Sequence, residues 1–103
     1  MSAELSELQA WFRAQCDGDW EHAFGIRIET LDNPGWSVTI DLAETELANA
    51  EFAAIEESVD DPERWISCLV REQRFIGACG PGMLPRVLGT FLAWARSAGA
   101  RAV

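Results

Sequence analysis

A β-hairpin signal in the first half of the chain constrains the fold more than any other feature. Residues 24–31 (FGIRIETL) alternate between apolar and polar side chains, as does the run 36–42 (WSVTIDL), which is the pattern of strands with one buried face. The first run would bury Phe24, Ile26 and Ile28, and the second Trp36, Val38, Ile40 and Leu42. We therefore predict an antiparallel hairpin.

The link between these runs, Asp32-Asn33-Pro34-Gly35, is a strong turn signal. Pro34 fixes φ at the first central position of a turn, and Gly35 supplies the positive φ that the second central position of a type II turn needs. The sequence therefore predicts a type II turn.

The sequence predicts two further strands clearly and a third with a helix as the alternative. Residues 64–71 read as a strand with Ile66, Cys68 and Val70 on one face and Trp65 and Leu69 on the other, and 74–79 read as the last strand. If Trp36 faces the core, Trp65 faces the opposite side of the sheet, where it is either a binding anchor or covered by a helix. The segment 52–58 could be a strand that starts at Phe52 and carries Ile55, although its Ala and Glu content favours a helix.

Amphipathic helices are predicted at both ends of the chain. Residues 2–16 carry a stripe of Leu5, Leu8, Phe12 and Cys16, with Ser2 as N-cap and Gly18 near the C-cap position. Residues 83–98 carry an apolar face, and Gly99 is the expected stop. That face comprises Leu84, Val87, Leu88, Phe91, Leu92 and Ala95. Residues 43–51 read as a connection with one helical turn.

The order of these elements predicts an α+β domain: an antiparallel sheet of four to five strands flanked by an N-terminal and a C-terminal helix. The 103 residues suit a single domain spanning 1–103, and this length can bury one core without disulfide or metal staples.

Several classes of protein are disfavoured by composition. No apolar run approaches a membrane span, and the N-terminal sequence lacks the basic region of a signal peptide. The three Cys provide no disulfide framework, so a cytoplasmic location is expected.

The charge is strongly asymmetric along the sequence. The net charge is −9, but residues 1–63 hold 16 acidic residues and two Arg (−14), whereas 64–103 hold six Arg and one Glu (+5). An acidic first part disfavours nucleic acid or an anionic membrane as a direct partner and suits a basic protein. The Arg-rich part is expected to neutralise some of these acids within the fold.

The densest polar cluster is Cys16-Asp17-Gly18-Asp19-Trp20-Glu21-His22. Cys16 and His22 match no zinc spacing, and the Asp-Gly-Asp run is not a calcium loop, so no metal site is expected. A structural or partner-contact loop fits better. Within it, Trp20 is either a binding anchor or a cover for the end of the first helix.

Catalysis is disfavoured because the chain has a single His, no Tyr and no paired-carboxylate pattern. No cofactor is expected. One enzymatic alternative remains, a small thiol enzyme such as a sulfurtransferase that uses Cys79 or Cys68. Cys79 precedes Gly80-Pro81-Gly82 and a helix N-terminus, a setting that lowers a thiol pKa. A further alternative is a structural subunit, which predicts a broad apolar patch.

Several motifs together resemble the immunity protein 53 family. They are Leu8-Gln9-x-Trp11-Phe12, the Cys16–His22 cluster, Gly25-Ile26-x-Ile28-x-Thr30-Leu31 followed by Asp32-Asn33-Pro34-Gly35-Trp36, Trp65 before Cys68, Phe75-x-Gly77-Ala78-x-Gly80-Pro81, and Phe91-Leu92-x-Trp94. The resemblance covers nearly the whole chain. One departure is Cys79-Gly80, where the family pattern is Gly-Gly.

This resemblance implies a small bacterial protein, not an enzyme, that binds and neutralises a cognate polymorphic toxin. The acidic surface would dock on a basic toxin domain, for example a nuclease, and block its active site. The residues expected to contact the toxin are Asp17, Asp19, Trp20, Glu21 and His22, followed by Asp32 and Trp36.

Overall fold

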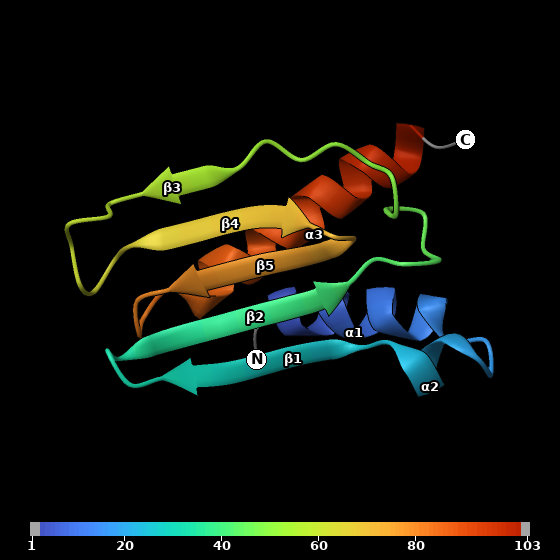
Figure 1. Cartoon of the computed structure of the whole chain (residues 1–103), viewed down its shortest axis with the longest axis horizontal. Coiled ribbons are helices and arrows are strands. Elements are labelled where there is room, and N and C mark those ends of the chain that lie inside the picture. The colour runs from blue at the N-terminus through green and yellow to red at the C-terminus, as the bar shows by residue number, and fades with distance from the viewer. Residues whose placement is uncertain (1–2, 102–103) are drawn as a thin grey trace.

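Two antiparallel hairpins lie side by side and, with one further short strand at the edge, form the sheet of this protein (Figure 1). The computed structural model describes residues 3–101, and their side chains over 3–98. The elements are α1 (Ala3–Gln15), α2 (Trp20–Ala23), β1 (Ile26–Leu31), β2 (Gly35–Asp41), β3 (Ile55–Glu57), β4 (Ile66–Arg71), β5 (Arg74–Cys79) and α3 (Leu84–Arg101).

All neighbouring strands pair antiparallel in the order β1-β2-β5-β4-β3. The two long helices lie on the same face of this sheet, and no described helix lies on the other face (Figure 1). The predicted α+β class and the antiparallel sheet flanked by an N-terminal and a C-terminal helix are thus confirmed, with five strands.

The core lies between the sheet and the helices, and the central strands set its geometry. Val38 of β2 lies opposite Gly77 of β5, which lies opposite Cys68 of β4. A Cβ at Gly77 would lie 2.5 Å from Cγ1 of Val87, so α3 packs directly on β5. The buried residues of this core are Leu8, Val38, Ile40, Leu42, Leu47, Ile66, Cys68, Phe75, Cys79, Val87, Leu88, Phe91, Leu92 and Ala95.

Helix α1 does not bury the stripe that its sequence predicts. Leu8 is buried, but Leu5 is 46% and Phe12 36% exposed. The helix packs instead through Leu8 and through Trp11, whose ring meets that of Phe91 edge-to-face at 5.1 Å. Because α1 contacts α3 beside it, the buried side of the helix is rotated toward Trp11. The expected N-cap, Ser2, lies outside the described residues.

The β1–β2 turn has a different geometry from the predicted type II turn. The Asn33–Pro34 peptide is cis, and Gly35 does not have a positive φ. Gly35 belongs to β2 and pairs with Leu31. A Cβ there would lie 2.3 Å from the carbonyl oxygen of Cys79, so the glycine is required by the close approach of β5 rather than by the turn.

The segment between β2 and β4 is mostly irregular. Residues 43–51 form a connection of successive turns without the predicted turn of helix, and Leu47 from this connection is fully buried. The strand interpretation of 52–58 is correct only for Ile55–Glu57. The strand begins at Ile55 and not at Phe52. The ring of Phe52 instead packs edge-to-face on those of Phe75 (5.5 Å) and Trp94 (5.1 Å).

Two helix boundaries also differ from the prediction. The loop after α1 contains a short helix, α2, that was not expected. Gly99 does not end the last helix, which continues to Arg101. The buried face predicted for α3 is confirmed except at Leu84, which is half-buried.

Trp65 lies on the open face of the sheet. It immediately precedes the buried Ile66, and its carbonyl accepts a hydrogen bond from Gly80 N at 2.9 Å, which continues the β4–β5 register. Alternation therefore directs the indole away from the helices. No helix within the described residues covers this face (Figure 1), so the structure does not show the helix cover that was one of the two alternatives for Trp65.

Candidate functional site

The loop from Cys16 to His22 is closed by its own acidic side chains. Oδ1 of Asp17 accepts hydrogen bonds from the backbone N–H groups of Asp19 and Trp20, both at 2.9 Å. These bonds, that of Trp20 first, lower the pKa of Asp17. Asp17 thereby holds the start of α2, because the first N–H groups of a helix have no partner within it.

Glu21 completes the same loop from the other side. Its carboxylate accepts hydrogen bonds from the N–H groups of Asp17 at 3.0 Å and Gly18 at 2.9 Å. Backbone amides lower the pKa of Glu21, its own first and then those of Asp17 and Gly18. Gly18 takes a φ of 97°, which favours glycine. This arrangement resembles a capping box, in which side chains and backbone satisfy one another.

Trp20 is not exposed. The side chain is 3% accessible, and its Nε1 donates a hydrogen bond to the carbonyl of Ala43 at 2.9 Å. Its ring meets Trp11 and Phe12 edge-to-face, with centroids 6.2 and 6.0 Å apart. Of the two alternatives for this residue, the structure therefore shows the second: Trp20 covers the end of α1. His22 and Asp19 are exposed.

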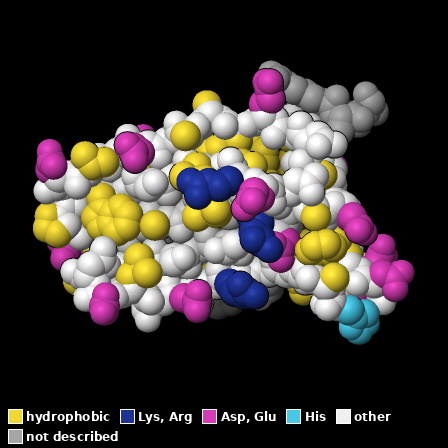
Figure 2. All heavy atoms as spheres, viewed as in Figure 1, with side chains coloured by type: hydrophobic (Ala, Val, Ile, Leu, Met, Phe, Trp, Pro, Cys, Tyr) yellow, Lys and Arg dark blue, Asp and Glu magenta, His cyan; other side chains and the backbone are white. Residues whose placement is uncertain are grey.

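The acidic loop meets the connection that follows β2. Antiparallel pairing of β1 with β2 places Ile26 opposite Ile40, so the chain segments flanking these residues lie together. Besides the Trp20–Ala43 bond, Nε1 of Trp11 donates to Oε2 of Glu46 at 2.8 Å. Six carboxylates lie on the two chain segments that meet here, and we call them the acidic end: Asp17, Asp19, Glu21, Glu44, Glu46 and Glu51. Figure 2 shows Asp and Glu side chains gathered at the end of the molecule that carries the His.

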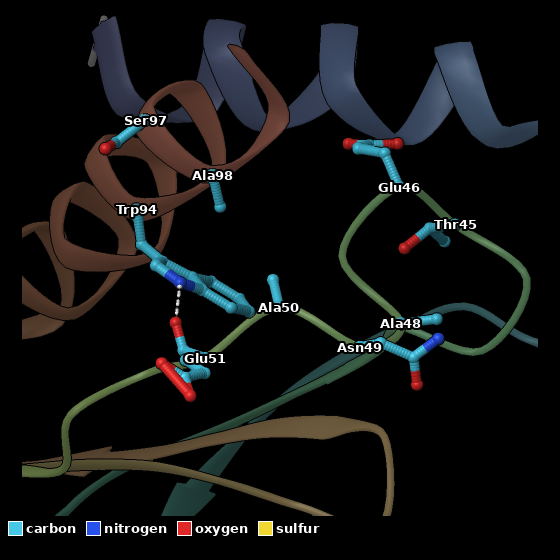
Figure 3. Close-up of a pocket in the computed structure, with 9 residues that line it drawn as sticks. All are labelled: Thr45, Glu46, Ala48, Asn49, Ala50, Glu51, Trp94, Ser97 and Ala98. Carbon is cyan, nitrogen blue, oxygen red and sulfur yellow. Dashed lines mark hydrogen bonds between the residues drawn. The ribbon is translucent and has the colours of Figure 1, made fainter. Parts of the chain in front are cut away.

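A cleft of about 430 Å³ opens at the acidic end, between the 43–51 connection and α3 (Figure 3). Its lining residues are Thr45, Glu46, Ala48, Asn49, Ala50, Glu51, Trp94, Ser97 and Ala98. The indole of Trp94 forms one wall, held by a hydrogen bond from its Nε1 to the carbonyl of Glu51 at 2.8 Å. The lining thus combines an indole with the side chains of Glu46 and Glu51, and aromatic rings and carboxylates are the groups that bind guanidinium or ammonium groups.

Asp32 and Trp36 lie apart from the acidic end. They flank the β1–β2 turn, and the six residues of β1 separate this turn from α2 by about 20 Å at roughly 3.3 Å per residue. Asp32 is exposed. Trp36 is half-buried, and its Nε1 donates to the carbonyl of Pro81 at 3.0 Å. The seven residues predicted to contact a partner therefore fall into two groups at opposite ends of the sheet.

The two central thiols are poorly placed for chemistry. Cys68 and Cys79 are fully buried on the helix-facing side of the sheet. Burial raises the pKa of Cys68 to about 11 and also raises the pKa of Cys79. A nucleophilic cysteine needs an accessible thiolate, so both findings oppose the thiol-enzyme alternative.

Ion pairs connect the two oppositely charged parts of the sequence. Arg74 contacts Asp41 at 3.1 Å, Arg86 contacts Glu57 at 2.6 Å, and Arg96 contacts Glu7. In each pair the Arg comes from residues 64–103 and the acid from 1–63, so the predicted internal neutralisation is confirmed. None of these pairs uses a carboxylate of the acidic end.

No group of three or more His, Cys, Asp or Glu side chains within the described residues is arranged to hold a metal ion. Neither α1 nor α3, as far as the structure describes them, combines the length and apolarity of a membrane-crossing helix.

The fold and the acidic end define a small α+β domain whose most distinctive surface is a concentration of carboxylates. The family model "Immunity protein 53" matches residues 5–96, which is most of the chain. The chain therefore belongs to the immunity protein 53 family, as the sequence motifs predicted. The same comparisons find no match among curated proteins or among solved structures.

Sequence reasoning missed four residues of the acidic end and its cleft: Glu44, Glu46, Glu51 and Trp94. The sequence does contain a signal for the three glutamates, although not for Trp94. Once the hairpin is predicted, antiparallel pairing requires residue 42 to lie beside residue 24. The acids after β2 must then approach those before β1. The position of Trp94 depends on how α3 crosses the sheet, which no local pattern specifies.

Proposed function

We propose that this protein binds and neutralises a cognate bacterial toxin domain, and that the acidic end is its docking surface. Membership of the immunity protein 53 family supports the general function. The observation that carries the choice of surface is that Trp11 and Trp20 hold together two segments which carry six carboxylates, none of them used by the three ion pairs.

The partner that fits this surface is a basic domain, for example a nuclease. Opposite charge accelerates association and selects the partner. A Lys or Arg of the toxin would enter the cleft between Glu46, Glu51 and the indole of Trp94, where a cation and an aromatic face attract each other. Inhibition follows from blocking the toxin's active site, and the immunity protein needs neither cofactor nor catalysis of its own.

Because the loop from Cys16 to His22 is already ordered, docking through it costs little conformational entropy. Asp17 and Glu21 are already fixed by backbone hydrogen bonds, so the loop loses little freedom on binding. Asp19 and Glu51 are exposed, and neither carboxylate belongs to an ion pair among the described residues. The setting we propose is the bacterial cytoplasm, which suits three free thiols, and the toxins are polymorphic toxins exchanged between competing cells.

The test uses the C-terminal domain of a secreted toxin encoded beside the gene for this chain, made catalytically inactive. Affinity and association rate are measured by surface plasmon resonance at several salt concentrations. Asp19→Lys combined with Glu51→Lys should weaken binding about tenfold or more, mainly through a slower association rate, and should reduce the salt dependence.

The matched control is Glu56→Lys with Asp60→Lys, which makes the same change in net charge on exposed residues of β3 and the loop after it. This control should change the affinity by less than about threefold. Equal losses in the two double variants would refute the acidic end as the docking surface. Failure of the wild-type chain to bind the toxin would refute the immunity function itself.

A further inference from the structure

Strand β1 is an edge of the sheet, so within the described residues one row of its backbone groups has no neighbouring strand. Asp41 N donates to Gly25 O at 3.0 Å, and hydrogen-bonded pairs alternate along an antiparallel ladder. Arg27 and Glu29 therefore bond to β2, whereas the N–H and C=O groups of Ile26, Ile28 and Thr30 point outward. The opposite edge, β3, has only three residues.

Apolar surface lies beside the same edge, on the side of the helices. Ile28 and Phe12 are each 36% exposed. A shallow hollow of about 250 Å³ is lined by Leu8, Gln9, Phe12 and Ile26. An edge strand flanked by apolar side chains is a template for pairing with another strand.

We propose that two copies of this chain pair β1 with β1, antiparallel, about a two-fold axis at Ile28. In this register Arg27 lies opposite Glu29 of the second copy, and Glu29 lies opposite Arg27. Opposite charges directly across a strand pair stabilise it. Ile26 lies opposite Thr30 of the copy, and each of the outward-pointing residues exchanges main-chain hydrogen bonds with its counterpart.

The neighbouring registers are less favourable. An axis at Glu29 places two carboxylates opposite each other, and an axis at Arg27 does the same with two guanidinium groups. An axis between residues would pair side chains that point to opposite faces of the sheet, which a two-fold symmetric pair does not permit. Within β1, Ile28 is therefore the centre that satisfies both alternation and charge.

The charge pattern favours a second copy over an unrelated strand. Arg27 and Glu29 are equidistant from Ile28 and opposite in sign, so the strand is complementary to itself when reversed. The pairing extends the five-stranded sheet across the axis and keeps the helices of both copies on one face. This inference is independent of the toxin and of the acidic end.

The test is the mass of the untagged chain in solution, measured by sedimentation equilibrium from micromolar to millimolar concentration at physiological salt. The wild type should change with concentration from 11.4 kDa toward twice that mass. Arg27→Glu and Glu29→Arg each place like charges opposite one another and should weaken dimerisation about tenfold or more. The double variant, which exchanges the two charges, should restore it.

Ile28→Pro provides a second measurement. It removes one outward-pointing N–H at an edge strand, where proline is tolerated, so the variant should fold and remain monomeric. A wild type that stays monomeric over the whole concentration range refutes the proposal. Protection of β1 from hydrogen exchange that appears only when toxin is added does not rescue it. Failure of the charge exchange to restore the dimer refutes the register.

Discussion

The indole N–H of Trp20 donates a hydrogen bond to the carbonyl of Ala43 at 2.9 Å, across 23 positions of the sequence. This bond fixes the acidic loop to the connection after β2. A residue that the sequence suggests as a surface anchor is instead the link that assembles the surface. Its effect on a partner must therefore be indirect.

Removal of this hydrogen bond should lower the stability of the fold, because Trp20 is buried and does not itself contact the partner. Trp20→Phe keeps an aromatic ring but deletes the donor, at a cost of about 1 kcal/mol, whereas Trp20→Ala should cost about 3–5 kcal/mol. Urea denaturation followed by circular dichroism measures both. A surface anchor would behave differently: Trp20→Ala would then leave the urea midpoint unchanged and reduce only toxin binding.

Acid should loosen the loop between Cys16 and His22. The pKa values of Asp17 and Glu21 are lowered in the folded chain, so both carboxylates contribute stability above their ordinary values of 3.8 and 4.5. That contribution is lost as the pH falls through the lowered values. The melting temperature of the wild type should therefore decline in this acidic range more steeply than that of Asp17→Asn with Glu21→Gln. Parallel curves would show that the two carboxylates are not held in this way.

Substitution by Ala should have different effects on stability at Gly35 and at Gly25. A Cβ at Gly35 would lie 2.3 Å from the carbonyl oxygen of Cys79, whereas a Cβ at Gly25 has no neighbour within 4 Å. Gly35→Ala should destabilise the protein by about 1–3 kcal/mol. Gly25→Ala should be neutral or stabilise by up to about 1 kcal/mol. Thermal unfolding of the two variants makes the comparison, and equal shifts would contradict the close approach of β2 and β5.

The thiols should differ in reactivity. Cys68 and Cys79 are buried with raised pKa values, and only Cys16 is partly accessible. In the native protein at neutral pH, iodoacetamide should label Cys16 first, and slowly, because burial and then Glu21 and Asp17 raise its pKa. Mass spectrometry identifies the labelled residue. Rapid native labelling of Cys68 or Cys79 would restore the thiol-enzyme alternative.

Alternation predicted the central strands well because it records burial directly, but it was wrong for Ile28 of the edge strand β1, which is 36% exposed. Residues 74–79 have the bounds that the sequence predicts, and Val38 and Ile40 are fully buried as expected. The stripe of α1 was less informative. Which of Leu5, Phe12 and Trp11 turns inward depends on where α3 lies, and that is a tertiary property outside any local window.

The sequence predicts that acidic residues form the candidate site, but it identifies only one of the two segments that carry them. The Cys16–His22 cluster forms one side of the acidic end, yet its Trp is buried, and the exposed acids include Glu44 and Glu51 from a segment that reads only as a connection. Asp32 and Trp36 belong to the same family-like motifs as this cluster, which is why the sequence predicts them as contacts too. The length of β1 separates them, since residues adjacent in a pattern need not be adjacent in space.

The position of β5 at the centre of the sheet has a consequence for synthesis. The first hairpin is complete once residue 41 has left the ribosome, but its inner edge is the partner of Arg74–Cys79. Until those residues emerge, β2 has no neighbour on that side and α3 is absent. The nascent chain therefore acquires its core late, because domains fold as units once their non-local contacts are available. Under the proposed function, only completed chains can neutralise the toxin, so a chain that is still being synthesised gives the cell no immunity.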